Sequence, residues 1–163
     1  MKSNLRILFV LVIITVITGV IWMIQDPKGD LTSNIQADFA IADTSLVTKI
    51  FIADNQSGAA TLERTENSRF WTLNGEHLAR KDATDLLLKT FSRIEVKGPV
   101  PQKQRETVIR NLAGIAKKVE IYEGGASPVK TWYVGTATPS HTGTYMVLET
   151  PKLGMSSEPF IVS

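Results

Sequence analysis

The chain has 163 residues, of which 43% are hydrophobic and 21% charged, with a formal net charge of +2 and no cysteine. This length allows one domain of ordinary size together with an anchor, and the apolar fraction is high enough to build a hydrophobic core. The lack of cysteine excludes a disulfide scaffold, cysteine-ligated metals and thiol catalysis.

An apolar run near the N-terminus predicts a membrane anchor. The 18 residues 7–24 contain no charged side chain, and as a helix they would span about 27 Å, close to the hydrocarbon thickness of a bilayer. Lys2 and Arg6 precede the run, so the positive-inside rule predicts a cytoplasmic N-terminus and an outer domain. A cleaved signal peptide is the alternative, but the run is longer than its apolar region and no small-x-small site follows. We therefore expect an uncleaved anchor over residues 1–25.

The anchor also carries residues suited to helix packing. Thr15, Thr18 and Gly19 occupy neighbouring positions, and small residues let membrane helices approach closely. We expect them to contact other membrane-protein subunits as well as the bilayer, although a passive tether is the alternative. Because Lys2 and Arg6 account for the whole net charge, the remainder is neutral, which argues against a nucleic-acid partner.

Residues 26–37 are polar and predict a tether, while residues 38–163 have the texture of a folded domain. Its first part predicts three strands, over residues 46–53, 60–64 and 69–73, of which the last ends at an Asn-Gly turn.

Two helices are expected next. The first, near residues 81–94, has an apolar face formed by Ala83, Leu86, Leu87, Thr90, Phe91 and Ile94. The second begins near Pro101 and ends by Gly114, with Val108, Ile109 and Leu112 toward the core.

Three more strands are expected over residues 118–122, 129–134 and 144–149, with a loop over 135–143. The order β-β-β-α-α-β-β-β is typical of an α+β fold with a mainly antiparallel sheet and its two helices between two strand clusters. The last residues, 157–163, form either an edge strand or the point at which the sequence is truncated.

Five segments resemble one known family. They are DFAIADTSLVTKIFIAD (38–54), WTLNG (71–75), DLLLKT (85–90), KKVEIYEG (117–124) and GTYMVLE (143–149). The pattern resembles the bacterial family catalogued as domain of unknown function (DUF) 4340, found mostly in Bacteroidetes, over the N-terminal half of a typical member. The resemblance implies a single-pass, envelope-facing protein, and some members are encoded near auxiliary ABC-transporter components of the gliding type. It supplies no catalytic residues.

The sequence contains little that indicates catalysis. His77 follows a turn, and His141 lies beside Ser140, but neighbours in an extended chain point to opposite sides. No metal-ligand spacing and no phosphate-binding loop occur, so we expect no cofactor and no metal. An envelope hydrolase that uses His141 remains an alternative.

One segment is strongly basic. Residues 97–118 hold six basic side chains against one acidic side chain, whereas residues 26–66 hold seven acidic and three basic ones. A solvated helix face is the simpler interpretation, and a docking patch for an acidic partner or anionic lipid is the sharper one. The predicted docking residues are Lys103, Arg105, Arg110, Lys117 and Lys118.

These features together predict a non-catalytic, single-pass protein of the bacterial inner membrane with its main domain in the periplasm. We expect an accessory subunit of an envelope complex, associated with ABC-type transport or gliding-type machinery. A periplasmic ligand- or peptide-binding domain, using the sheet edge or the 135–143 loop, is the other alternative.

Overall fold

The structure is a computed structural model that describes residue 15 and residues 38–54, 58–65 and 68–163. The predicted anchor and the tether lie outside the described residues, except for Thr15, which is helical and exposed. Thr18 and Gly19 are also outside them. Within the described ranges no helix is long and apolar enough to cross a membrane. The described residues from 38 onward belong to one compact unit.

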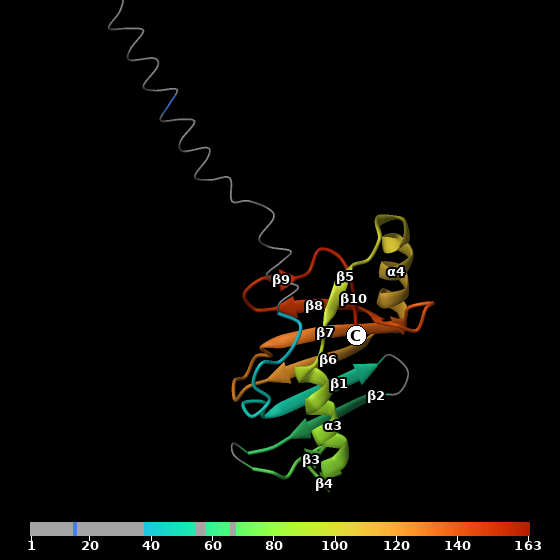
Figure 1. Cartoon of the computed structure of the whole chain (residues 1–163). Helices are drawn as coiled ribbons and strands as arrows, with labels where there is room; N and C mark the ends of the chain where they lie inside the picture. Colours follow the sequence, from blue (N-terminus) through green and yellow to red (C-terminus); the bar gives the residue numbers. More distant parts are fainter. Residues whose placement is uncertain (1–14, 16–37, 55–57, 66–67) are drawn as a thin grey trace, which may run out of the picture. The chain divides into compact units, whose positions relative to one another are not determined.

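Ten strands of this unit form one sheet in which every neighbouring pair is antiparallel (Figure 1). The order is β4-β3-β2-β1-β6-β7-β8-β10-β5, and β9 pairs with β8. The strands are β1 (Lys49–Asp54), β2 (Gly58–Glu63), β3 (Thr72–Leu73), β4 (His77–Leu78), β5 (Val96–Pro99), β6 (Lys117–Tyr122), β7 (Lys130–Ala137), β8 (Thr144–Thr150), β9 (Gly154–Met155) and β10 (Phe160–Val162). The predicted α+β class with a mainly antiparallel sheet and two helices is confirmed.

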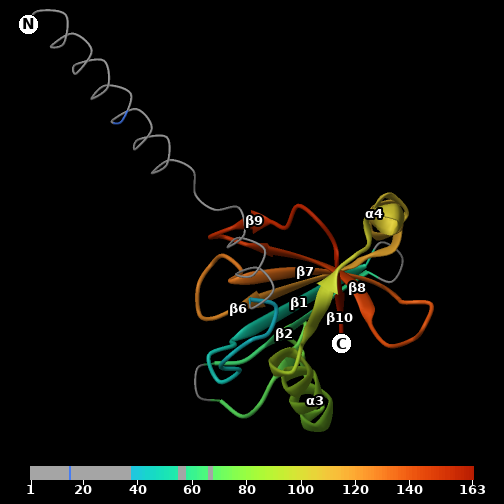
Figure 2. The same cartoon turned by 45° about the horizontal axis from the view of Figure 1, so that its top comes forward.

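The two helices lie at different ends of the sheet (Figure 2). Helix α3 (Lys81–Ser92) contributes Phe91 to the larger hydrophobic cluster, together with Ile50, Trp132 and Leu148. Helix α4 (Gln102–Ile115) contributes to a smaller cluster that includes Tyr145 and Val147. Because successive strand residues point to opposite faces, Tyr145 and Leu148 lie on opposite faces of β8, so the two helices pack on opposite faces of the sheet.

We call the α3 side the core face and the α4 side the open face. The core face is also covered by the segment that precedes β1. Its Phe39 ring meets Phe160 edge-on at 5.5 Å, and the Ile41 N–H donates to the Phe91 carbonyl at 3.0 Å. The ammonium of Lys130 bonds Asp38 Oδ1 at 2.9 Å, so the segment is also held to β7 by a charged contact.

Several details differ from the sequence-based expectation. Phe70 was expected within a strand, but it precedes β3 and is 67% exposed. Leu86 was expected on the apolar face of its helix, but it is 65% exposed on α3. Ile109 was also expected to face the core, but it is 46% exposed, whereas Val108 and Leu112 are the buried residues of α4. Helical spacing alone therefore predicted a wider apolar face for each helix than the structure has.

The sheet is also larger than predicted. The short strands β4, β5 and β9 were not expected, and β7 extends to Ala137, which shortens the predicted 135–143 loop. An edge strand was one of two alternatives for the last segment; residues 160–162 do form a strand, β10, but it pairs with both β8 and β5, so β5 is the edge on that side. Such pairings join residues far apart in sequence, which local patterns do not reveal.

Candidate functional site

A groove of about 600 Å³ lies between α3 and the core face of the sheet. We call it the α3 groove. Its helical wall is formed by α3 and the turn after it, with Leu86, Thr90, Phe91 and Ile94 among the lining residues. Its volume falls in the range of about 300–1,000 Å³ that is typical of small-molecule sites.

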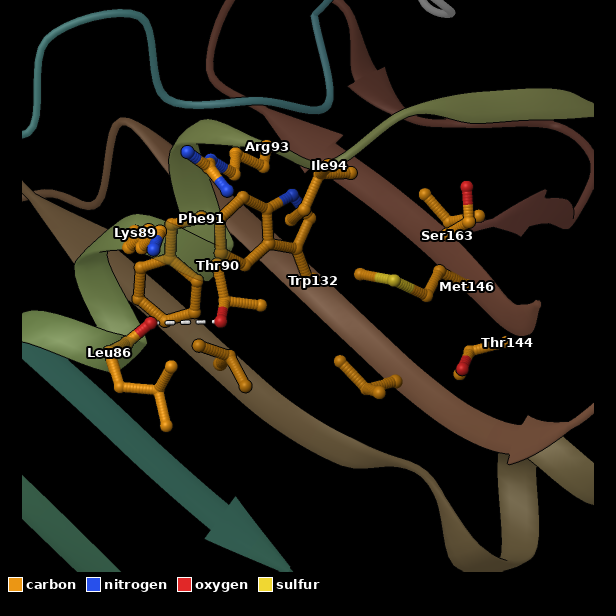
Figure 3. A pocket seen from close by; sticks show the side chains of 13 residues that line it. Leu86, Lys89, Thr90, Phe91, Arg93, Ile94, Trp132, Thr144, Met146 and Ser163 are labelled. Carbon is orange, nitrogen blue, oxygen red and sulfur yellow. Dashed lines mark hydrogen bonds between the residues drawn. The ribbon is translucent and has the colours of Figure 1, made fainter. Parts of the chain in front are cut away.

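The floor of the α3 groove is apolar because it is the continuation of the core face beyond α3. Val119, Trp132, Val134, Met146 and Val162 form it, from four adjacent strands. Figure 3 shows Trp132 beside Phe91, with Met146 and Thr144 across the space. The centres of the Phe91 and Trp132 rings are 4.8 Å apart in an edge-to-face arrangement. This contact packs α3, the helical wall of the groove, against β7 in its floor.

The rim of the α3 groove on the helix side is cationic. Lys89 and Arg93 are exposed lining residues four positions apart, and neither has an acidic partner within the described part of the chain. None of the lining residues is aspartate or glutamate. The Thr90 hydroxyl donates to the Leu86 carbonyl at 2.8 Å, so its proton is already used. The two cations are therefore the free polar groups of this wall.

The groove also adjoins an unsatisfied donor. The indole Nε1 of Trp132 is buried and has no hydrogen-bond partner among the described residues. An unpaired buried donor costs about 1–3 kcal/mol. In Figure 3 this nitrogen lies toward Ile94, at the side of the groove where Arg93 projects.

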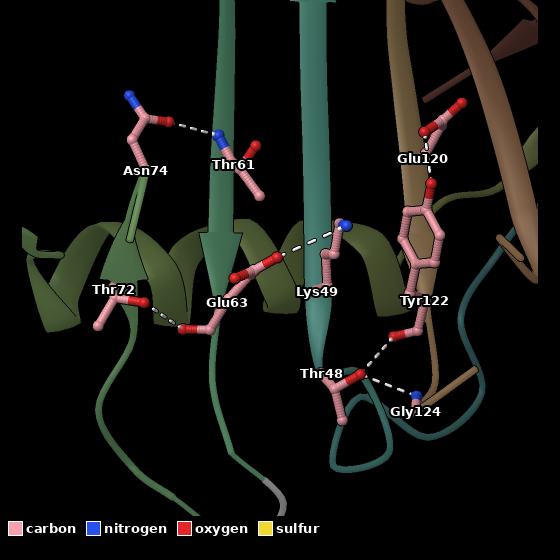
Figure 4. A network of polar contacts seen from close by, with 9 residues as sticks. All are labelled: Thr48, Lys49, Thr61, Glu63, Thr72, Asn74, Glu120, Tyr122 and Gly124. Carbon is pink, nitrogen blue, oxygen red and sulfur yellow. Dashed lines mark hydrogen bonds and ion pairs between the residues drawn. The ribbon is translucent and has the colours of Figure 1, made fainter. Parts of the chain in front are cut away.

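The open face of the sheet carries a second set of polar groups (Figure 4). The Tyr122 hydroxyl donates to Glu120 at 2.7 Å, and the Lys118 ammonium lies 2.5 Å from the same carboxylate. Lys49 pairs with Glu63 at 3.5 Å and lies 4.8 Å from the centre of the Tyr122 ring. Cross-strand register brings these side chains together, since Lys49 is opposite Tyr122 in the β1–β6 ladder.

These contacts shift several pKa values. The hydrogen bond to Glu120 is the main cause that raises the pKa of Tyr122, and burial followed by the bond to Glu149 raises that of Tyr133. Burial alone would raise the pKa of Glu120, but hydrogen bonds from Lys118 and Tyr122 outweigh it and lower that pKa. The hydrogen bond to Glu120 raises the pKa of Lys118.

The raised tyrosine pKa values predict a loss of stability in alkali. A group whose pKa is higher in the folded state than in the unfolded chain contributes stability below its unfolded pKa, here 10.0, and this is lost as pH rises through the folded pKa. We expect the free energy of unfolding to fall above about pH 10, and to fall less steeply in a Tyr122→Phe/Tyr133→Phe variant. Urea unfolding at a series of pH values measures both slopes. Identical slopes would contradict the assignment.

A polar hollow of about 520 Å³ lies near the ends of β1 and β2. Lys49 and Glu63 line it and pair with each other, and the guanidinium of Arg64 donates to the carbonyl oxygens of Val47 and Thr44, both at 2.7 Å. The charges of this hollow are satisfied internally, unlike those of the α3 groove. The α3 groove is therefore the stronger candidate site.

The predicted docking residues fall on α4 and the start of β6, and most of them have acidic partners. Arg105 pairs with Glu158, Arg110 with Glu106 at 2.9 Å, Lys117 with Asp54 at 3.8 Å and Lys118 with Glu120 at 2.5 Å. Lys103 has no acidic partner within the described ranges. The charge available to a partner is therefore smaller than the sequence count indicates.

The histidines lie away from the α3 groove. His141 is exposed in the turn between β7 and β8 with a positive φ of 56°, and its N–H donates to the Thr138 carbonyl at 2.8 Å. The Ser140 hydroxyl contacts the hydroxyls of Thr138 and Thr142, not His141. His77 lies 4.0 Å from Glu76 at the exposed β4 edge. Across the described residues no group of three or more potential metal ligands occurs.

No family model, no curated protein and no solved structure matches this chain. The resemblance to the DUF 4340 family therefore stays a prediction.

Sequence reasoning did not find the α3 groove, and placed ligand binding at the sheet edge or the 135–143 loop instead. One signal was present: Lys89 and Arg93 lie four residues apart at the C-terminal end of a predicted helix, although Asp85 precedes Lys89 by one turn.

Proposed function

We propose that this protein is a single-pass, membrane-anchored accessory subunit of a bacterial envelope complex, with a non-catalytic α+β domain outside the inner membrane. The observation that carries the proposal is the uncharged run of 18 residues, 7–24, directly ahead of a folded antiparallel domain. Two basic residues, Lys2 and Arg6, precede the run and one, Lys28, closely follows it, and this difference supports a cytoplasmic N-terminus and a periplasmic domain.

The accessory role is supported by the anchor and by the resemblance to the DUF 4340 family. Thr15, Thr18 and Gly19 would let the anchor pack against the helices of membrane subunits. The genetic setting of some members of the family favours a partner from ABC-type transport or gliding-type machinery. In this proposal the outer domain holds a partner rather than transforming a substrate.

The test is a purification of the tagged full-length protein from its native membrane in mild detergent, followed by mass spectrometry. Stoichiometric recovery of membrane subunits is the expected result. Recovery of the protein alone, at the same yield and after gentle cross-linking, would contradict the accessory role.

The α4 surface provides a sharper prediction. Reversing Lys103 and Arg110 with K103E/R110E is expected to lower partner recovery roughly fivefold, since exposed ion pairs contribute about 0.5 kcal/mol each. Both side chains are exposed on α4, so folding should be unaffected. The matched control, R69E/K152E, reverses two exposed cations elsewhere and should retain the partner. Equal recovery from both variants would exclude this surface.

A second candidate function is ligand binding by the outer domain. It is favoured by the α3 groove, a mainly apolar hollow of about 600 Å³ with Lys89 and Arg93 at its rim. Ligand-dependent changes in the unfolding temperature of the protein would detect such binding, because a ligand that binds only the folded state stabilises it.

A further inference from the structure

We propose that the α3 groove binds an amphipathic anion of the fatty-acid class: an aliphatic body lies along the floor, and a carboxylate lies between Lys89 and Arg93. The inference rests on the ligand-binding function and not on the accessory role. It names the chemical class of the ligand and the residues that recognise each end.

The aliphatic end follows from the floor. Val119, Val134, Met146 and Val162 offer only hydrocarbon and thioether surface to the groove, and such surface is stabilised by covering it with apolar atoms. Elsewhere the core face is covered by α3 and by the segment before β1. At this end Ile94, in the turn after α3, packs beside the floor and lines the groove, and a ligand would extend this apolar cover.

The acidic end follows from charge complementarity. Both cationic lining residues lie on the α3 side, no acidic side chain lines the groove, and neither Lys89 nor Arg93 has an acidic partner in the part of the chain that the structure describes. A carboxylate placed there would accept charge-assisted hydrogen bonds from a guanidinium and an ammonium. A neutral alcohol of the same chain length would gain the apolar contact but not these bonds.

The size of the hollow limits the ligand. About 600 Å³ suits a small molecule rather than a folded domain. Lys89 and Arg93 stand together at one rim, and the strand side is mainly apolar with Thr144 and Ser163 as its polar lining residues, so the fitting ligand has one acidic head and one apolar body. This separation of charged and apolar surface favours a single-chain carboxylate. A nucleotide or a sugar would need polar partners along the whole length of the molecule.

The test uses the full chain in nanodiscs of phosphatidylcholine and a photoreactive dodecanoate with a diazirine on its chain. After illumination, mass spectrometry locates the label. The tryptic peptide 131–152 contains the floor residues Trp132, Val134 and Met146. Label in residues 7–24 reports probe dissolved in the bilayer and serves as an internal reference. We expect saturable labelling of peptide 131–152, about tenfold stronger than with the matching photoreactive dodecanol.

Two variants test recognition of the acidic end and of the aliphatic end separately. K89A/R93A should reduce the labelling by dodecanoate roughly tenfold and leave that by dodecanol unchanged. The matched control, R69A/K152A, removes two exposed cations that do not line the groove. Because trypsin no longer cleaves at position 152 in this variant, its fragment 131–163 is compared with the sum of peptides 131–152 and 153–163 of the parent protein, and the two should carry equal label. Thr144→Phe, which fills the groove from β8, should reduce labelling by both probes.

Each contrary result has a distinct meaning. Equal labelling by acid and alcohol, or no effect of K89A/R93A, would overturn the assignment of an anionic ligand while ligand binding survives. Label confined to residues 7–24 would overturn ligand binding in the groove altogether. Displacement of the probe by an acidic amphipathic helical peptide at a lower concentration than by dodecanoate would assign the groove to a protein partner and overturn the proposal. The accessory role depends on none of these results.

Discussion

Replacing Trp132 with alanine is expected to lower the free energy of unfolding by about 3–5 kcal/mol, the range for large-to-small changes in a core. Trp132 is only 1% exposed and is the largest of the fully buried side chains. It touches Phe91 of α3 at a ring distance of 4.8 Å and therefore joins the helix to the centre of the sheet. Because small domains are stable by about 5–15 kcal/mol, this single change removes a large share of the total.

Urea unfolding followed by far-ultraviolet circular dichroism measures the loss. Trp132→Phe is the informative comparison, because it keeps an aromatic ring and removes the buried Nε1 donor that has no partner in the described structure. We expect it to cost much less than alanine. Leu78→Ala, at a side chain 71% exposed on β4, should change stability by no more than about 0.5 kcal/mol. A loss below about 1 kcal/mol for Trp132→Ala would show that the α3 contact is not central to the fold.

The regular elements could be predicted because their signals are local. Helix α4 was expected from Pro101 to Gly114 and is observed from Gln102 to Ile115. Strand β6 was expected over 118–122 and begins one residue earlier. In these two segments the periodicity and the flanking turn residues agree on the type and position of the element.

The strands that the sequence did not predict depend on tertiary contacts rather than on local sequence patterns. Strand β5 contains Gly98 and Pro99, which usually interrupt strands, and it forms only because β10 supplies its hydrogen-bond partners at the sheet edge. Phe70 has a strand-like sequence context yet lies before β3, where no neighbouring strand covers its ring. Both outcomes depend on the tertiary environment, which no sequence window contains.

The candidate site was less predictable than the fold. The basic segment was visible in the sequence, but the pairing of Arg105 with Glu158 joins residues more than fifty positions apart and removes part of its charge. Conversely, Lys89 and Arg93 looked like ordinary solvated residues of a helix. Their interest arises only from the apolar groove beside them, whose floor is assembled from four strands.

Replacing Gly135 with alanine is the second change with a large expected effect. Gly135 lies on β7 where α4 approaches the open face, and a Cβ placed there would be 2.6 Å from Leu112 Cδ2 and 3.1 Å from the Tyr145 carbonyl oxygen. The leucine side chain can move, but the carbonyl belongs to the β7–β8 ladder and cannot move freely. Overpacking of this kind costs about 1–3 kcal/mol, so we expect a loss in that range.

Gly114→Ala provides the matched control for this loss. Gly114 lies in α4, and a Cβ there would meet nothing within 4 Å, so we expect a gain of about 0.5–1 kcal/mol from helix propensity. Both changes restrict the unfolded chain alike, so their difference in urea unfolding isolates the contact between α4 and the sheet. Adding Leu112→Ala to Gly135→Ala should cost less than the sum of the single changes, because the new methyl group occupies the vacated space. Strict additivity would mean that the strain arises from the Tyr145 carbonyl alone, and a neutral Gly135→Ala would mean that α4 does not pack closely on β7.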